Sequence, residues 1–168
     1  RRQRQMCIRD SCKTGECIYN QMVPGEILEP VYKEAVKAEV SIAVYNDAEK
    51  ELIAANGVTR YIDADARACD VAVRETDDFV KVVNFGFNKI MLSGEPDSMK
   101  NIEKHMREMF GDKVNVFRSD PHFVELLPKY VDKGVAVEKL MRYLDINREK
   151  VICVGDSIND MPMLRYAG

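Results

Sequence analysis

Long apolar segments are missing from this sequence. No run approaches the roughly 18 apolar residues that a membrane-spanning helix needs, and we expect no signal peptide because no apolar region follows the basic start at residues 1–4. An excess of basic residues is missing too, since Lys and Arg total 25 against 28 Asp and Glu, for a formal net charge of -3. This balance gives no electrostatic footprint for nucleic acid or an anionic membrane. We therefore expect a cytoplasmic protein that binds neither.

Cysteine pairs at metal-binding spacing are also missing. The 5 cysteines are an odd number, and without a secretion signal they indicate free thiols rather than a disulfide framework. Cys7, Cys12 and Cys17 recur every five residues, whereas structural zinc sites use pairs about two to four residues apart. Neither histidine lies near them in the sequence, so we expect no zinc site there.

The composition is that of a chain that builds a packed core, because 46% of its residues are hydrophobic and 32% are charged. Its length of 168 residues suits one domain or slightly more. Residues 1–12 lack periodicity, and we expect them to be a non-native or disordered tail. An Arg-rich arm for nucleic acid is the alternative, but its arginines have no aromatic partners.

Residues 13–127 alternate between strand and helix patterns. The patterns predict strands at 17–23, 40–45, 51–55, 89–93, 114–118 and 123–127, and helices at 24–38, at 63–74 and from Pro96 onward. In the last of these helices Met99, Ile102, Met106 and Met109 recur at helical spacing, which favours core packing over a metal or cofactor surface. We expect an α+β domain, an antiparallel sheet with helices on one face.

The pattern changes at residue 128. A helix is predicted at 134–145, and the continuous apolar run at 151–154 predicts a parallel strand buried on both faces. With a further helix at 160–166, these elements make one unit of a doubly wound α/β domain, a partial Rossmann-like core at 128–168. Because a lone parallel strand has no sheet to join, we expect the chain to be a fragment. We also expect this part to be poorly ordered or prone to aggregate by itself.

Polar residues follow that predicted strand directly, in the order Gly-Asp-Ser-Ile-Asn-Asp at 155–160. In open α/β sheets, ligands bind beyond the carboxyl ends of the strands, and a helix N-terminus there favours phosphate. The carboxylates of Asp156 and Asp160 and the amide of Asn159 supply the oxygen ligands that Mg²⁺ prefers. The alternative is that these residues only cap the following helix.

Lys133 stands 23 residues before Asp156, at the start of the preceding predicted helix. A helix start favours acidic side chains, so a lysine is out of place there. Its ammonium could neutralise a phosphoryl oxygen and a neighbouring carboxylate together. The alternative is a solvated surface lysine.

These residues together resemble one enzyme family. Asp132-Lys133-Gly134, a helix, an apolar strand and then GDSINDMPML resemble motifs three and four of the haloacid dehalogenase (HAD) superfamily of phosphotransferases. More narrowly, HFVELLPKYVDKGVAVEKL and VICVGDSINDMPMLRYAG are similar to Cof-type hydrolases of subclass IIB. The resemblance is specific over 121–168 and rests on element order before that. It implies a Rossmann-like core at 128–168 and a large α/β cap, which corresponds to residues 13–127.

The same resemblance implies a Mg²⁺-dependent phosphatase of small phosphomonoesters, such as sugar phosphates, that acts through an aspartyl-phosphate. Asp156 would be the carboxylate ligand of Mg²⁺, and Asp160 would support the metal site. Lys133 would hold the phosphate and orient the nucleophile, and Asn159 would hydrogen-bond the phosphoryl group.

The nucleophile motif of that family is missing from this sequence. The motif reads Asp-x-Asp-Gly-Thr/Val, and neither it nor the family's Ser/Thr motif occurs upstream of the predicted cap. Asp63-Ala64-Asp65 is the one candidate, but Ala66 stands in place of the glycine, and the segment lies inside the predicted cap. We therefore expect this chain to lack catalytic activity.

Two other functions fit part of the pattern. The phosphorylation domain of a P-type cation pump carries a similar Gly-Asp-x-x-Asn-Asp, with transmembrane helices close after it. A non-catalytic binding module would instead keep the cap for protein contact. The spacing of Lys133 and the cap-like region favour the phosphatase, while the sequence specifies neither its substrate nor its oligomeric state.

Overall fold

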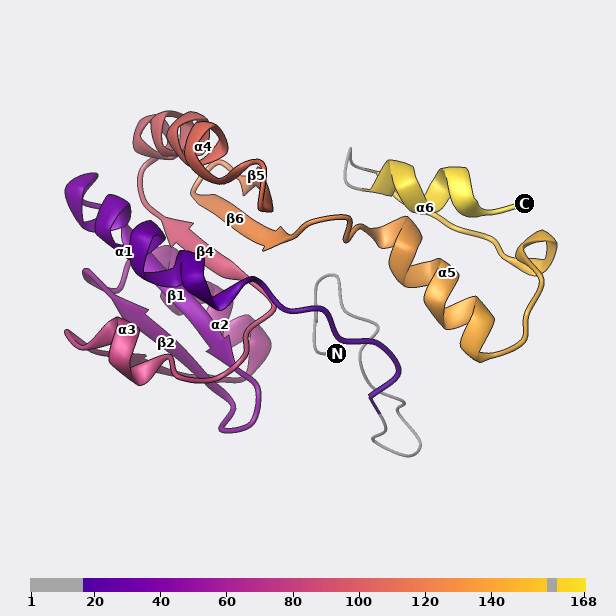
Figure 1. Ribbon diagram of the computed structural model, residues 1–168, viewed down its shortest axis with the longest axis horizontal. Coiled ribbons are helices and arrows are strands. Elements are labelled where there is room, and N and C mark those ends of the chain that lie inside the picture. Colours follow the sequence, from indigo (N-terminus) through magenta and orange to yellow (C-terminus); the bar gives the residue numbers. More distant parts are fainter. Residues whose placement is uncertain (1–16, 157–159) are drawn as a thin grey trace. The chain divides into compact units, whose positions relative to one another are not determined.

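The computed structural model describes residues 17–156 and 160–168 (Figure 1). Its described residues form two compact units. We call residues 22–129 the sheet unit, and residues 130–168 with residues 17–21 the helical unit. Each is described by itself below.

The sheet unit contains the six strands found in the described residues. Its elements in chain order are η1 (Gly25–Ile27), α1 (Leu28–Lys37), β1 (Ser41–Asn46), β2 (Glu51–Ala55), α2 (Arg60–Cys69), β3 (Ala72–Glu75), α3 (Phe79–Val82), β4 (Ile90–Ser93), α4 (Pro96–Phe110), β5 (Val114–Asp120) and β6 (Phe123–Pro128). The helical unit contains α5 (Lys133–Tyr143), η2 (Arg148–Lys150) and α6 (Met161–Tyr166). None of the helices in the described ranges is long and apolar enough to cross a membrane.

The strands form one sheet in the order β3-β2-β1-β4-β6-β5. Every neighbouring pair is antiparallel except β2 and β3. Parallel neighbours need a crossover connection, and α2 provides it because it lies between β2 and β3 in the chain. The strands predicted at 40–45 and 51–55 are confirmed as β1 and β2, and they pair as a hairpin with Val44 opposite Ile53.

Each face of the sheet has its own apolar core, because successive strand side chains point to opposite faces. The first face, which includes Ile42 and Val44, packs against α1, α3 and α4. The second face, which includes Ala43, packs against Ile62 and Ala66 of α2. Figure 1 shows these helices on the two sides of the sheet. The predicted α+β class is confirmed, and α2 is the exception to the single helical face that we expected.

The helices differ from expectation in two details. The segment 63–74 is not one helix, because α2 ends where Asp70 adopts a left-handed conformation with φ of 55° and β3 then begins. In α4 the core stripe continues to Phe110, which is 7% exposed, while Met109 is 46% exposed. The four-residue step from Met106 to Phe110 keeps that helix face on the sheet. The strand predicted at 17–23 is not formed over residues 18–23.

The predicted strand at 151–154 is not formed either. Residues 151–154 belong to no helix or strand, and Ile152 and Val154 are 91% and 85% exposed. The described part of the helical unit contains no strand that could pair with this segment. A buried single strand would leave its N–H and C=O groups without partners, so the segment stays on the surface.

Candidate active site

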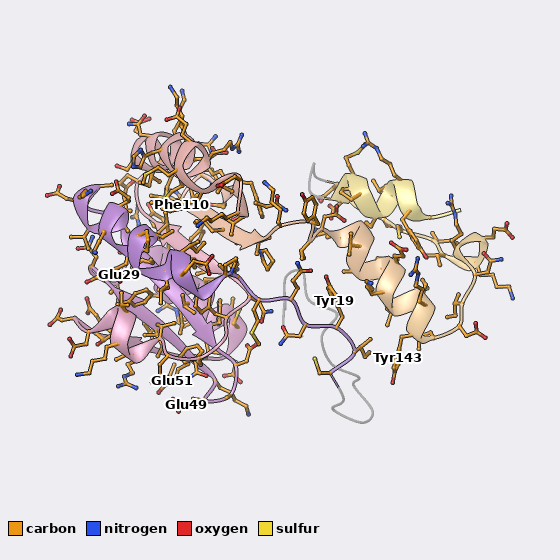
Figure 2. All side chains as sticks on the ribbon, viewed as in Figure 1. Tyr19, Glu29, Glu49, Glu51, Phe110 and Tyr143 are labelled. Carbon is orange, nitrogen blue, oxygen red and sulfur yellow. The ribbon has the colours of Figure 1, made fainter. Side chains whose placement is uncertain are left out.

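The starts of α5 and α6 meet the backbone of Asp156 in the helical unit. Lys133 is the first residue of α5, and Asp132 before it is the N-cap, whose carboxylate accepts a hydrogen bond of 2.9 Å from the amide of Val135. Asp160 immediately precedes α6. Tyr143, labelled in Figure 2, ends α5 and so lies at the opposite end of that helix from Lys133.

Asp160 connects these segments through both of its carboxylate oxygens. Its Oδ1 accepts a charged hydrogen bond from Lys133 Nζ, and its Oδ2 accepts from the backbone N–H of Asp156 at 3.1 Å. Asp160 is only 5% exposed, and the Lys133 side chain is half-buried. Buried carboxylates require such partners. The structure thus brings together three of the four predicted site residues, although Asp156 takes part through its backbone.

Two glycines make this approach possible. A Cβ on Gly155 would lie 2.3 Å from Cβ of Asp160, and one on Gly134 would lie 2.7 Å from the carbonyl oxygen of Pro162. Both distances are too short for any side chain, so the packing needs glycine at both positions. Asp132 and these glycines are not among the site residues that the sequence predicts. For Asp132 and Gly134 the signal is the string Asp-Lys-Gly, in which Asp is a favoured N-cap residue, and for Gly155 it is the string Gly-Asp that follows the apolar run.

The carboxylate of Asp156 is open. Asp156 is exposed, and its carboxylate accepts no hydrogen bond or ion pair within the described ranges. Mg²⁺ is commonly held by only one or two carboxylates together with waters and substrate phosphates. The exposed carboxylate of Asp156 and the hydrogen-bonded carboxylate of Asp160 fit that donor set. The described residues contain no group of three or more His, Cys, Asp or Glu that could enclose a metal.

The other predicted residues lie elsewhere. Asn159 is outside the described residues, so its predicted contact with phosphate stays a prediction. Asp63 and Asp65 belong to α2 of the sheet unit, in the middle of a helix rather than at a strand end. Asp65 accepts a hydrogen bond from the hydroxyl of Tyr45. This hydrogen bond gives Asp65 a structural role, so no catalytic role is needed to explain it.

Comparison with known proteins identifies the family. The family model of haloacid dehalogenase-like hydrolases matches residues 7–168. The chain belongs to this HAD-like hydrolase family. A Haemophilus influenzae protein named "Putative phosphatase" is 29% identical over 92% of this chain and 60% of its own length. A Klebsiella pneumoniae protein named HMP-PP phosphatase is 25% identical over 92% of this chain and 55% of its own.

The solved structures agree with this assignment. The crystal structure of a haloacid dehalogenase-like hydrolase from Bacteroides thetaiotaomicron is 30% identical to the chain, with a TM-score of 0.85. The match covers 93% of this chain and 58% of that protein. The resemblance to the HAD superfamily is therefore confirmed. The chain spans little more than half the length of these relatives.

Proposed function

We propose that this HAD-like chain is part of a Mg²⁺-dependent phosphatase that hydrolyses small phosphomonoesters, with sugar phosphates as its substrate class and the cytoplasm as its location. In this proposal, residues 13–127 form the cap and residues 128–168 the catalytic part. One observation carries the proposal. Asp160 ties the ammonium of Lys133 at the start of α5 to the backbone of Asp156.

Lys133 is the phosphate-binding group in this proposal. Its ammonium has three N–H donors, and Asp160 accepts one of them. The N-terminus of α5 adds a partial positive charge beside it. Asn159 donates a further hydrogen bond to the phosphoryl group. Because Asp160 fixes the ammonium, phosphate binding needs little reorganisation of the side chain.

Asp156 and Asp160 are the metal-site residues. The exposed carboxylate of Asp156 supplies a direct oxygen ligand. Asp160 is held by Lys133 and by the Asp156 amide, so it orients the backbone at the residue that carries the ligand. Mg²⁺ supplies positive charge that offsets the charge on the phosphoryl oxygens.

The nucleophile is an aspartate of an Asp-x-Asp-Gly motif, which this sequence does not contain. Its carboxylate attacks phosphorus, the bond from phosphorus to the leaving alcohol breaks, and water hydrolyses the aspartyl-phosphate to free phosphate. The curated relatives are longer than this chain, and we assign the motif to that additional length. This chain alone is accordingly inactive.

The first experiment measures binding of inorganic phosphate to this chain, with and without Mg²⁺. Lys133→Met removes the ammonium, and we expect it to weaken phosphate binding about tenfold or more, since a hydrogen bond to a charged group is lost. Asp156→Asn should abolish the gain that Mg²⁺ gives. Lys150→Met, which removes an exposed lysine of the same unit, is the matched control. Equal phosphate binding by all four proteins would refute the assignment.

A second experiment addresses the missing nucleophile. We expect no hydrolysis of p-nitrophenyl phosphate by this chain at any Mg²⁺ concentration. Mg²⁺-dependent turnover that is lost in Asp156→Asn would show that a nucleophile is present. Asp63 would then be the first residue to replace.

A further inference from the structure

An open groove of about 400 Å³ lies between α1 and α4. Polar side chains from both helices line it. They are Glu34 and Lys37 near the end of α1, and Ser98, Asn101 and His105 of α4. Both helices pack on the first face of the sheet, so every residue of this groove belongs to the sheet unit. A volume of this size is usual for a small-molecule pocket.

Helical spacing brings these side chains to the groove. Ser98, Asn101 and His105 follow one another at steps of three and four residues, so they share one side of α4. Glu34 and Lys37 are likewise three residues apart on α1. The buried residues of α4 are a different set, namely Met99, Ile102, Met106 and Phe110. The polar residues of the groove therefore lie beside the core, and the packing of the core does not require them.

Glu34 holds two basic groups at the groove. Its Oε1 accepts a hydrogen bond of 2.6 Å from Lys37 Nζ, and its Oε2 lies 2.8 Å from His105 Nε2. The Glu34 side chain is only 15% exposed, and such a carboxylate requires partners of this kind. Because a carboxylate only accepts hydrogen bonds, the neutral His105 ring carries its hydrogen on Nε2 and none on Nδ1.

The groove keeps several hydrogen-bonding groups free. Lys37 has three N–H groups and uses one of them for Glu34. Nδ1 of His105 and the side chains of Ser98 and Asn101 have no hydrogen-bond partner among the described residues. When the His105 ring takes up a proton, Nδ1 becomes a donor as well. The groove then has charged donors at Lys37 and His105 and neutral polar groups at Ser98 and Asn101.

The charges of the groove favour a singly charged anion. Glu34 cancels the charge of Lys37, so the groove has no net charge while His105 is neutral and one positive charge when His105 is protonated. A carboxylate matches this charge better than a phosphate dianion does. The other charged side chains of this part of α4 and of the adjoining strand pair among themselves, namely Lys104 with Glu108, and Glu103 with Arg107 and Arg118.

We propose that this groove binds a small hydroxycarboxylate. Its carboxylate accepts charge-assisted hydrogen bonds from Lys37 Nζ and from Nδ1 of protonated His105, and its hydroxyl groups bind Ser98 and Asn101. Protonation of His105 and binding of the anion favour each other, because two coupled binding events are reciprocal. This site goes beyond the proposed function and is independent of it, since none of its residues belongs to the helical unit.

The coupling gives the site a pH dependence. Histidine is the side chain whose ordinary pKa places its charge change between about pH 5 and 8. Hydrogen bonds from Lys37 and His105 lower the pKa of Glu34, so Glu34 stays ionised when His105 gains its charge. We therefore expect tighter carboxylate binding at about pH 6 than at about pH 8. A carboxylate held by Lys37 alone would bind equally at both pH values.

NMR titration of the ¹⁵N-labelled chain tests the site. The probes are lactate, glycerate and gluconate, and the matched control is lactamide, which has a neutral amide in place of the carboxylate of lactate. We expect at least one hydroxycarboxylate to shift the amide signals of Lys37, Asn101 and His105, with an affinity about fivefold or more higher at the lower pH. Lactamide should leave these signals in place.

Two variants separate the roles of the charged donors. Lys37→Met should lower the affinity about tenfold or more at both pH values, because a hydrogen bond to a charged group is lost. His105→Gln keeps a donor for Glu34 but takes up no proton, so its affinity should no longer depend on pH. Lys33→Met, which removes an exposed lysine of α1 outside the groove, is the matched control and should bind as the parent does. Thermal unfolding shows that each variant is folded.

Four results would overturn the site. The first is that no hydroxycarboxylate shifts the signals of the three residues. The second is that lactamide shifts them as strongly as lactate does. The third is that His105→Gln keeps the pH dependence of the parent, or that the parent has none. The fourth is that inorganic phosphate shifts these signals more strongly than every hydroxycarboxylate. None of these results bears on phosphate binding at Lys133, which is followed by the signals of the helical unit.

Discussion

At the scale of single residues, two hydrogen bonds hold the carboxylate of Glu34 in its charged form. Glu34 on α1 accepts from Lys37 Nζ at 2.6 Å and faces Nε2 of His105 on α4 at 2.8 Å. The hydrogen bond from Lys37, and after it that from His105, lowers the pKa of Glu34 below its usual 4.5. Since His105 lies on a different helix, this carboxylate links α1 to α4.

This lowered pKa predicts a pH-dependent loss of stability. The contribution of Glu34 is fully present above its unfolded pKa near 4.5 and disappears as the pH falls through the lower folded pKa. Glu34→Gln should therefore lower Tm at neutral pH, and the gap to the parent should close below pH 4.5. Thermal unfolding followed by circular dichroism between neutral and acidic pH measures this gap. Glu29→Gln, in an exposed ion pair of the same helix, is the control. A gap that widens in acid would contradict the prediction.

Gly155 is the residue on which the geometry of Asp160 depends. Gly155→Ala would place a Cβ 2.3 Å from Cβ of Asp160, which must then move away from Lys133 and the Asp156 amide. We expect this substitution to lower the stability of the helical unit by about 1 to 3 kcal/mol, the usual cost of overpacking. Amide exchange at the start of α5 and at α6 measures the loss. Gly25→Ala is the control, because its Cβ would meet nothing within 4 Å. Unchanged amide exchange in Gly155→Ala would mean that Gly155 and Asp160 are not in close contact in solution.

At the scale of elements, α4 shows how closely helical periodicity predicts a core. The apolar spacing after Pro96 correctly placed Met99, Ile102 and Met106 against the sheet. The prediction of Met109 for the last turn was wrong, because Met109 and Phe110 both lie near the edge of the stripe and periodicity alone does not separate them. The sheet decides, since the face that meets the strands buries Phe110 and leaves Met109 exposed.

Two alanine variants of α4 test this difference. Met106 is fully buried, so Met106→Ala should lower the free energy of unfolding by about 2 to 5 kcal/mol through lost burial and an added cavity. Met109→Ala should change it by less than about 0.5 kcal/mol, as is usual for exposed positions. Urea denaturation of both proteins measures the effects. Equal losses would place Met109 in the core after all.

At the scale of the whole molecule, the two units differ in how much apolar core each one contains. The sheet unit has apolar cores on both faces of a six-stranded sheet. In the helical unit, the apolar residues Ile152 and Val154 are exposed. The expectation that 128–168 is poorly ordered by itself stays a prediction. The exposure of residues 152 and 154 agrees with its reason, which is that the apolar run has no sheet to join.

Hydrogen exchange tests that difference. We expect the amides of Ile152, Cys153 and Val154 to exchange quickly, because this segment pairs with no described strand. The amides of β1, a central strand with two antiparallel neighbours, should be the most protected. Exchange monitored by NMR or mass spectrometry gives both rates. Protection of 152–154 equal to that of β1 would show that the segment has a strand partner, for example in an oligomer.

The sequence by itself determined the family, most of the elements and the candidate site residues. Local patterns carry this information, because helical periodicity, strand alternation and the string Gly-Asp-Ser-Ile-Asn-Asp each depend on neighbours along the chain. The ion pair of Lys133 with Asp160 could not be predicted from local patterns, because the two residues are far apart in the sequence. The close packing of Gly155 against Asp160 could not be predicted from local patterns either.

Only the tertiary structure decided which surfaces meet. It placed α2 on the second face, made β3 parallel to β2, and put Lys89 beside Glu125 across two strands. It also left Ile152 and Val154 of the apolar run at 151–154 exposed. Strand pairing and burial depend on partners that are remote in sequence, and a segment whose local pattern suits a buried strand stays exposed when its unit provides no strand to pair with it.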